Sequence, residues 1–333
     1  MISYLTALGL VISCANHDPQ EILIDPIVKR ISDTSLYADN VDWSAVNARY
    51  QELTQDKHTL SDLSQGLQYL LNATGDRHGA FRSADDFSIV AAYSGPADDS
   101  DHRDPDFVNR IINDVSARFS HRALHSDVGY LRVVGIGPHR SIKENADEIR
   151  AGLDALASRG INRWIVDLRF NGGGNMNPMI AGLAPLLGDG YIGGSVDANG
   201  EAVRRYVIEN GQFFDSGNLV SEMPNQPVID RNQKVAVLLS RYTISSGELV
   251  AVAFKGRQNT VFIGEPSAGY TTATGYDQVR DDLFMMISQS VFVDRNGKTY
   301  DNRVGVDIPM NFEPTDTLSD DTQIQTAIRW LLN

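Results

Sequence analysis

The stretch Lys234–Phe254, KVAVLLSRYTISSGELVAVAF, joins two apolar segments through a short turn that contains Ser245 and Ser246. The run Val235–Leu239 is typical of a buried strand, and the segment after the serines predicts a helix. A serine at a helix start lies beside unpaired backbone N–H groups and the positive end of the helix dipole, which can stabilise an oxyanion. Ser245 is therefore a candidate nucleophile, although Ser245 and Glu248 also fit an ordinary capping box.

A second motif lies upstream, where the apolar strand Trp164–Leu168 runs into the sequence DLRFNGGG at Asp167–Gly174. A glycine run after a strand is also typical of a simple turn or of a phosphate-binding loop. The phosphate-binding motifs that add Gly-Lys-Ser/Thr or G-x-G-x-x-G are absent here. We expect this turn and the serine turn to line one pocket.

A serine hydroxyl is a weak nucleophile until a base takes its proton. The candidate base is His78, which lies in the glycine-flanked turn Gly75–Gly79. Asp76 is positioned in sequence to orient the imidazole locally, and Asp301 is an alternative from elsewhere in the fold. The residues alone leave both open, and a lone histidine is also typical of a surface or capping position.

The composition limits the kind of protein and its partners. The chain has 333 residues with 42% hydrophobic content, enough for one large domain or two smaller ones. A net charge of −14, from 43 acidic and 29 basic residues, argues against a nucleic-acid partner. The single cysteine, Cys14, excludes an intrachain disulfide and a multi-cysteine zinc site. We expect neither a metal nor a cofactor.

The first residues indicate export. Ile2–Ser13 is mostly apolar and has the length of a signal-peptide core, and Val11–Cys14 resembles the lipobox of bacterial lipoproteins. Residues 1–14 are therefore predicted to be a lipoprotein signal peptide, with a lipid anchor at Cys14 and a location in the bacterial periplasm or cell envelope. The leader lacks the usual positive residues, so a buried N-terminal strand or helix with an inert cysteine is the alternative.

Helical patterns dominate the residues after the leader. One helix is predicted to start near Trp43, and Leu60–Leu71 repeats apolar residues at spacings of three and four, with Gly75 as a stop. Residues 15–85 are therefore predicted to form a small helical subdomain. Asp104–Phe119 predicts a further capped amphipathic helix.

From Gly129 onward, strand and helix patterns alternate, which predicts an α/β core over residues 86–333. The predicted strands are Tyr130–Val134, Trp164–Leu168, Lys234–Leu239, Thr260–Ile263 and Leu283–Val293. The predicted helices are Ser141–Gly160, Pro178–Leu187, Ser246–Phe254 and Asp320–Leu332.

Four motifs in this order resemble the S41 peptidases, the tail-specific and tricorn-like serine proteases. They are GYLRV at Gly129–Val133, DLRFNGGG at Asp167–Gly174, SSGE at Ser245–Glu248 and IGEPSAG at Ile263–Gly269. The resemblance implies a Clp-protease/crotonase-like core. It covers the N-terminal helices more loosely.

The resemblance also implies roles for single residues. The family nucleophile stands three positions before the motif glutamate, which selects Ser245, and the N–H groups of Ser246 and Gly173 would form the oxyanion hole. Members with a lysine base carry it where this chain has Tyr270, so the tricorn-like branch with a histidine base, matched by His78, is expected. Asp301 approximates the late acidic residue of that branch.

The implied function is a serine peptidase that cleaves a peptide or protein substrate through an acyl-enzyme. The segment between Gly79 and Val128 is too short for a PDZ domain with its linkers. This layout is similar to the nisin-resistance proteins and to the retinoid-binding modules of the superfamily. A non-catalytic ligand-binding module of the same fold is therefore the alternative.

Overall fold

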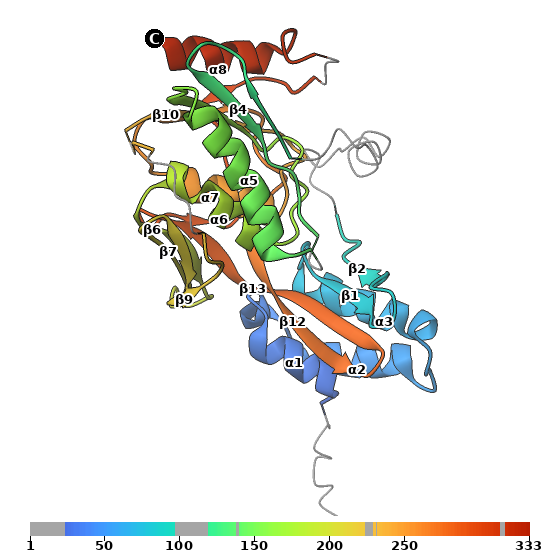
Figure 1. The fold of residues 1–333 in the computed structure, drawn as a ribbon. Helices are drawn as coiled ribbons and strands as arrows, with labels where there is room; N and C mark the ends of the chain where they lie inside the picture. The colour runs from blue at the N-terminus through green and yellow to red at the C-terminus, as the bar shows by residue number, and fades with distance from the viewer. Residues whose placement is uncertain (1–23, 97–118, 138–139, 224–228, 231, 314–316) are drawn as a thin grey trace, which may run out of the picture.

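Two β-sheets organise the structure (Figure 1). The computed structural model describes residues 24–96, 119–137, 140–223, 229–230, 232–313 and 317–333. The first sheet has the order β15-β11-β10-β5-β4-β3, and its strands are parallel except for β3 at one edge. Its strands are β3 (Ser120–Ala123), β4 (Val128–Arg132), β5 (Arg163–Asp167), β10 (Lys234–Leu239), β11 (Thr260–Gly264) and β15 (Ile308–Pro309).

Helices cover both faces of this sheet, as expected for parallel strands that are apolar along their whole length. Helices α5 (Ile142–Ala157), α6 (Met176–Leu187) and α7 (Ser246–Phe254) form the main core on one face. Helix α8 (Thr322–Leu332) packs on the other face, where Ile324 and Leu331 contact the strands. Figure 1 shows α8 at the end of the molecule farthest from the N-terminal helices.

The second sheet is antiparallel and has the order β2-β1-β13-β6-β7-β8-β9, with β12 and β14 also paired to β13. The long strand β13 pairs with β1 near its start and with β6 near its end, while β12 lies along its other side. The strands are β1 (Ala80–Ser83), β2 (Ile89–Ala92), β6 (Gly190–Val196), β7 (Ala202–Glu209), β8 (Gln212–Asp215), β9 (Asn218–Leu219), β12 (Thr272–Arg280), β13 (Leu283–Asp294) and β14 (Thr299–Tyr300).

The N-terminal helices pack against one face of β1 and β13, where Phe81, Leu283 and Met285 are buried with the helix residues. These helices are α1 (Pro26–Thr34), the short 3-10 helix η1 (Ala38–Asn40), α2 (Trp43–Thr54) and α3 (Leu60–Thr74). The predicted division after residue 85 falls in the turn that joins β1 to β2. The hairpin β12–β13 runs from the core across these helices (Figure 1).

The predicted α/β fold with N-terminal helices is confirmed, and most element ends shift by one to three residues. No element was predicted for Gly190–Leu219, which forms strands β6 to β9, or for the residues of β12. The predicted signal peptide and nearly all of the predicted helix Asp104–Phe119 lie outside the described residues. No described helix is long and apolar enough to span a bilayer.

Candidate active site

Ser245 lies where the loop after β10 enters α7, in a backbone conformation that is unusual for a serine. Its φ is 54° and its ψ is −117°. The other α-helices of the described residues start at N-caps with negative φ, for example Thr59 at −86° and Ser141 at −57°. A strained residue costs about 1–3 kcal/mol and persists only where the surroundings enforce it. A sharp strand-to-helix turn of this kind exposes a serine hydroxyl.

Glu248 enforces this turn from within the protein. Its carboxylate accepts the Ser245 N–H at 2.7 Å, the Ser267 hydroxyl at 2.5 Å, and the N–H groups of Gly269 at 2.7 Å and Tyr270 at 2.8 Å. Burial raises the pKa of Glu248 to about 7, against these hydrogen bonds, which favour the charged form. The glutamate therefore connects the serine turn to the loop that leads into β12.

The glycine loop after β5 lies directly beside the serine turn. Gly173 has φ +90°, and a Cβ there would lie 2.9 Å from Ser245 Cβ and 3.3 Å from Ser246 N. Only glycine fits this conformation and this approach. The Gly173 N–H donates to Asn171 Oδ1 at 3.0 Å, and no described residue accepts a hydrogen bond from the Ser246 N–H. The two predicted oxyanion donors are thus neighbours, and one of them has an internal partner.

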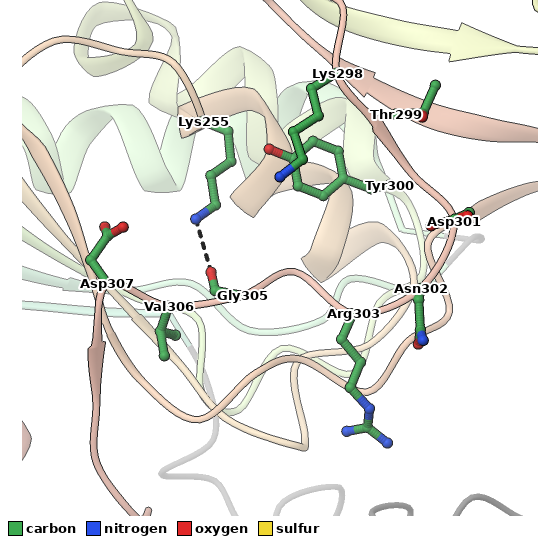
Figure 2. A pocket seen from close by; sticks show the side chains of 10 residues that line it. All are labelled: Lys255, Lys298, Thr299, Tyr300, Asp301, Asn302, Arg303, Gly305, Val306 and Asp307. Carbon is green, nitrogen blue, oxygen red and sulfur yellow. Dashed lines mark hydrogen bonds between the residues drawn. The ribbon is translucent and has the colours of Figure 1, made fainter.

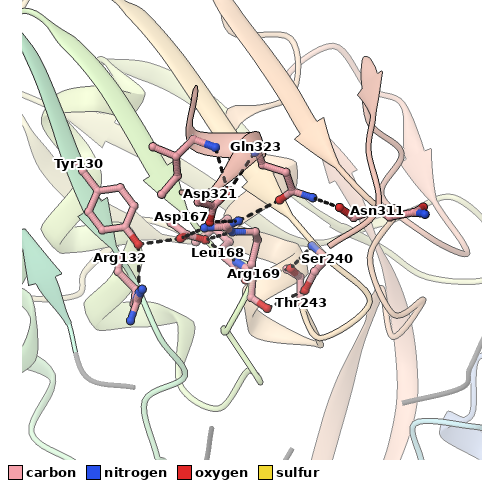
Figure 3. A network of polar contacts seen from close by, with 11 residues as sticks. Tyr130, Arg132, Asp167, Leu168, Arg169, Ser240, Thr243, Asn311, Asp321 and Gln323 are labelled. Carbon is pink, nitrogen blue, oxygen red and sulfur yellow. Dashed lines mark hydrogen bonds and ion pairs between the residues drawn. The ribbon is translucent and has the colours of Figure 1, made fainter. Parts of the chain in front are cut away.

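A buried ion network holds the strand that leads into this glycine loop (Figure 3). Arg169 is 1% exposed and pairs with Asp167 at 2.8 Å and with Asp321, at the start of α8, at 2.7 Å. Burial opposes the charge of Asp167, but Arg169 holds its pKa below the usual value. Ser240 and Thr243, from the loop before Ser245, donate to the carbonyls of Arg169 and Leu168. The network thereby fixes the glycine loop and the serine turn relative to each other.

His78 is held by a chain of hydroxyl groups that ends on a carboxylate. Its Nδ1 lies 2.9 Å from Thr272 Oγ1, which lies 2.8 Å from Ser288 Oγ, and Ser288 donates to Asp76 Oδ1 at 2.8 Å. Asp76 is fully buried and also accepts the N–H groups of His78, Gly79 and Ser288. An ionised carboxylate only accepts hydrogen bonds, so the chain runs from Nδ1–H toward Asp76. This order leaves the lone pair on Nε2.

The ring of His78 contacts the loop that Glu248 organises. It packs edge-on against Tyr270 with 5.4 Å between ring centroids, and the Arg77 guanidinium lies 5.7 Å from the Tyr270 ring centre. Burial lowers the pKa of His78, with the Asp76 charge opposing this effect. A neutral imidazole is the form that can accept a proton. No hydrogen bond joins His78 to Ser245 within the described residues.

Asp301 lies directly after β14. Its side chain is exposed and lines a cavity of about 410 Å³ together with Lys255, Lys298 and Arg303 (Figure 2). Lys255 donates to the carbonyl of Gly305 at 2.8 Å in this cavity. No hydrogen bond from Asp301 to His78 is present in the part of the chain that the structure describes. Of the two carboxylates considered, Asp76 is the one linked to the imidazole.

Three residues of the candidate site were not predicted. Thr272 and Ser288 join His78 to Asp76, and the side-chain oxygen of Asn171 accepts a hydrogen bond from the Gly173 N–H. Thr272 and Ser288 lie 194 and 212 positions from their partners His78 and Asp76, so no local pattern indicates them. Asn171 lies in the glycine motif, two residues before Gly173. This position could have indicated that its side chain contacts the predicted oxyanion donor. No described group of three His, Cys, Asp or Glu side chains could hold a metal ion.

Three known proteins resemble this chain in sequence or in structure. The nisin-resistance protein of Lactococcus lactis subsp. lactis is 26% identical over 277 residues, which are 83% of this chain and 78% of that protein. A lipoprotein from Streptococcus agalactiae superposes with a TM-score of 0.67 at 20% identity, over 92% of this chain and 93% of that chain. The photosystem II D1 C-terminal processing protease superposes with a TM-score of 0.52 at 13% identity, over 85% and 90% of the two chains.

These structural likenesses establish the fold and support the Clp-protease/crotonase-like core. The model of peptidase family S41 matches residues 127–310, which is more than half of the 333 residues. This region contains β4, the glycine loop, Ser245 with Glu248, and the loop that leads into β12. The chain therefore belongs to peptidase family S41.

Proposed function

We propose that this chain is a serine peptidase in which Ser245 attacks the scissile carbonyl and forms an acyl-enzyme. The observation that carries the proposal is the strained conformation of Ser245 at the start of α7, with φ 54° and ψ −117°. An ordinary N-cap serine has a relaxed extended backbone and gains nothing from strain. Glu248 maintains this strain at the N-cap of α7. The strain is consistent with a serine hydroxyl that is presented to a substrate.

His78 is the proposed general base. The Nδ1–H group donates toward Thr272, so Nε2 is the nitrogen that takes the serine proton and later returns it to the leaving amine. Asp76, reached through Thr272 and Ser288, takes the orienting role for which Asp301 was the alternative. It stabilises the imidazolium by charge without touching the ring.

The N–H groups of Ser246 and Gly173 are the proposed oxyanion donors, each contributing about 3 kcal/mol to transition-state stabilisation. An oxyanion competes with Asn171 Oδ1 for the Gly173 N–H, so substrate binding has to displace this hydrogen bond. The serine and the imidazole also have to approach within hydrogen-bonding reach. Catalytic hydrogen bonds are often long without substrate and tighten in the complex.

Paired serine variants test this proposal. Ser245→Ala is expected to lower peptide hydrolysis at least about a thousandfold, because it removes the nucleophile. Ser246→Ala keeps the backbone N–H and is the matched control, with activity within about tenfold of the wild type. The readout is cleavage of a mixed peptide library followed by mass spectrometry, with circular dichroism to confirm folding. Equal cleavage by wild type and Ser245→Ala would instead favour the non-catalytic ligand-binding module.

The proposed substrate is a peptide or protein outside the cytoplasm. The similar Streptococcus agalactiae structure is described as a lipoprotein, and the Lactococcus relative is named for nisin resistance. These descriptions support the expected export and the lipid anchor at Cys14. Mass spectrometry of the mature N-terminus tests this expectation: an acylated Cys14 supports the anchor, and an intact Met1 contradicts it.

A further inference from the structure

Among the described residues, helices cover one face of the sheet formed by β1, β13 and β12, and the other face, here called the uncovered face, carries no helix. Side chains alternate along each strand, so neighbours in sequence point to opposite faces. Phe81 and Met285 point into the helical core, and Asp277 pairs with Arg30 of α1 at 3.0 Å. Their neighbours therefore point away from the helices. In the described residues, no helix makes an extensive contact with β12, and Tyr276 on that second face is 47% exposed.

An aromatic platform, made of Phe87, Tyr276 and Phe284, lies on the uncovered face. Tyr276 stacks on Phe284 at 4.8 Å and on Phe87 at 5.5 Å between ring centroids. The strand residue Ile89, which is 59% exposed, points to the same face as Arg82, its pairing partner on β1. Three clustered rings, of which Tyr276 is exposed and the other two are half-buried, are a low-entropy contact surface for an apolar side chain.

The aromatic platform is continuous with the candidate active site along the strands. Thr272, which contacts His78, and Tyr276 both lie on β12, four residues apart, with one irregularity of the β12–β13 register between them at Ala273 and Thr274. The spacing places the platform about 13 Å from the imidazole contact, at about 3.3 Å per residue. A peptide with an extended backbone advances by the same distance in four residues. The platform would thus meet the fourth residue away from the cleaved bond.

Strand β12 provides a backbone edge along this path. It pairs with β13 on one side, and within the described chain no strand pairs with its other side. An unpaired edge accepts an extended peptide as an additional strand, with main-chain hydrogen bonds for affinity and side-chain contacts for specificity.

An acidic rim, made of Asp85, Asp86, Asp281 and Asp282, closes the far end of the uncovered face. The two turns that carry these residues are joined by a hydrogen bond of 2.9 Å from the Ala84 N–H to the Asp282 carbonyl. Arg82 and Arg280 are the nearby cations, and Arg280 already pairs with Asp282 at 3.0 Å. The four carboxylates outnumber these two guanidinium groups by two, and Arg280 also donates to the carbonyl of His58 at 3.2 Å. This charge complements a basic residue of a ligand.

We propose that the uncovered face of β1, β13 and β12 is the docking surface for the substrate of the proposed peptidase. The substrate class is an extended peptide with a large apolar side chain about four residues from the cleaved bond and a basic residue beyond it. The aromatic platform receives the apolar side chain, and the acidic rim receives the basic one. This inference rests on the proposed function for the distance between the apolar side chain and the cleaved bond. Binding of the peptide to the surface does not require catalysis.

Binding to the inactive Ser245→Ala protein tests the surface separately from catalysis. The probes are pools of short random peptides with a fixed Phe or a fixed Ser, ending in Lys residues or in Asp residues. Phe pools ending in Lys are expected to be retained about tenfold better than Ser pools ending in Asp. Adding Tyr276→Ser should remove most of this preference. Val203→Ser is the matched control, because Val203 on β7 is also 47% exposed, and this variant should keep the preference for the Phe pools.

The acidic rim has its own arm of the experiment. The double change Asp85→Asn with Asp86→Asn should abolish the preference for pools that end in Lys. Added salt should weaken the retention of these pools by the protein with the unaltered acidic rim. Glu148→Gln with Glu201→Gln removes the same charge elsewhere on the surface and should leave retention unchanged. Equal retention of all pools, or a preference that survives both sets of changes, overturns the docking surface.

Cleavage assays with the same pools separate the two proposals. In the active protein, Tyr276→Ser should raise KM about tenfold for Phe pools with little change in kcat, and cuts should map about four residues from Phe. Tyr276-dependent retention without any Ser245-dependent cleavage would uphold the docking surface and refute the peptidase. Ser245-dependent cleavage that ignores Tyr276 would do the reverse.

Discussion

The hydroxyl of Thr272 is the direct contact of His78 Nδ1, so its loss isolates the positioning of the base. Thr272→Val is expected to lower kcat by about tenfold to a hundredfold. A hydroxyl that accepts Nδ1–H favours the imidazolium, so its loss lowers the pKa of His78 further. The acid limb of the activity profile, already below pH about 6.5 because burial lowers the pKa, should move to still lower pH.

Thr272→Ser keeps the hydroxyl and is the conservative control for this change. It should restore both kcat and the position of the acid limb, measured as the pH dependence of kcat and kcat/KM. If Thr272→Val leaves the limb in place, the hydroxyl does not act on the base.

The two candidate carboxylates give a second contrast at the scale of single residues. Ser288→Ala removes the hydroxyl between Thr272 and Asp76 and should lower kcat about tenfold or more, whereas Asp301→Asn should stay within about threefold of the wild type. Asp76→Asn should lose both activity and stability, because an amide N–H₂ would face the Ser288 N–H that Asp76 now accepts. Peptide turnover and urea unfolding measure these effects. A larger kcat loss for Asp301→Asn than for Ser288→Ala would return the orienting role to Asp301.

At the scale of elements, α8 is tied to the end of β5 by the Asp321–Arg169 pair, which is 2.7 Å long and buried. Asn is as good an N-cap as Asp, so Asp321→Asn removes the charge while keeping the cap of α8. The change should lower the free energy of unfolding by about 1–3 kcal/mol, because Arg169 then keeps only Asp167 as a charged partner.

Asp320→Asn, at the adjacent exposed position, is the control and should change the free energy of unfolding by about 0.5 kcal/mol or less. Urea unfolding monitored by tryptophan fluorescence gives both values. Equal effects at the two positions would mean that the buried pair does not stabilise the junction of α8 with the glycine loop.

Elements with strong apolar patterns were predictable, whereas weakly patterned ones were not. The predicted bounds of β10 and α7 match the structure, because an apolar strand and an apolar helix flank an unambiguous turn. Strands β6 to β9 were missed because β6 contains several glycines and much of β7 is exposed, so neither shows a clear alternation. Strand β12 is mostly half-buried and polar, and it becomes a strand through its pairing with β13.

At the scale of the whole molecule, Glu248 links folding to pH. Burial raises the pKa of Glu248 from 4.5 to about 7, so the folded protein retains a proton that the unfolded chain releases. The contribution of this retained proton to the free energy of unfolding is complete below pH 4.5 and is lost as the pH rises to about 7. The free energy of unfolding changes by up to about 3 kcal/mol over this range.

The comparison of wild type with Glu248→Gln isolates this titration from the other ionisable groups. The difference in unfolding free energy between the two proteins should fall as the pH rises through this range, measured by urea unfolding at several pH values. A difference that stays constant, or that grows with pH, would show that the four hydrogen bonds keep the carboxylate charged.

The sequence by itself determined the strand-to-helix turn with Ser245, the glycine loop beside it and the histidine turn, because each depends on local backbone chemistry within a few residues. It also indicated the family, through motifs in a fixed order. Only the tertiary structure decided how His78 is held, because Thr272, Ser288 and Asp76 come together through the register of β12 and β13. Register depends on the packing of both sheet faces, and a shift of one residue would turn these hydroxyls away from the imidazole.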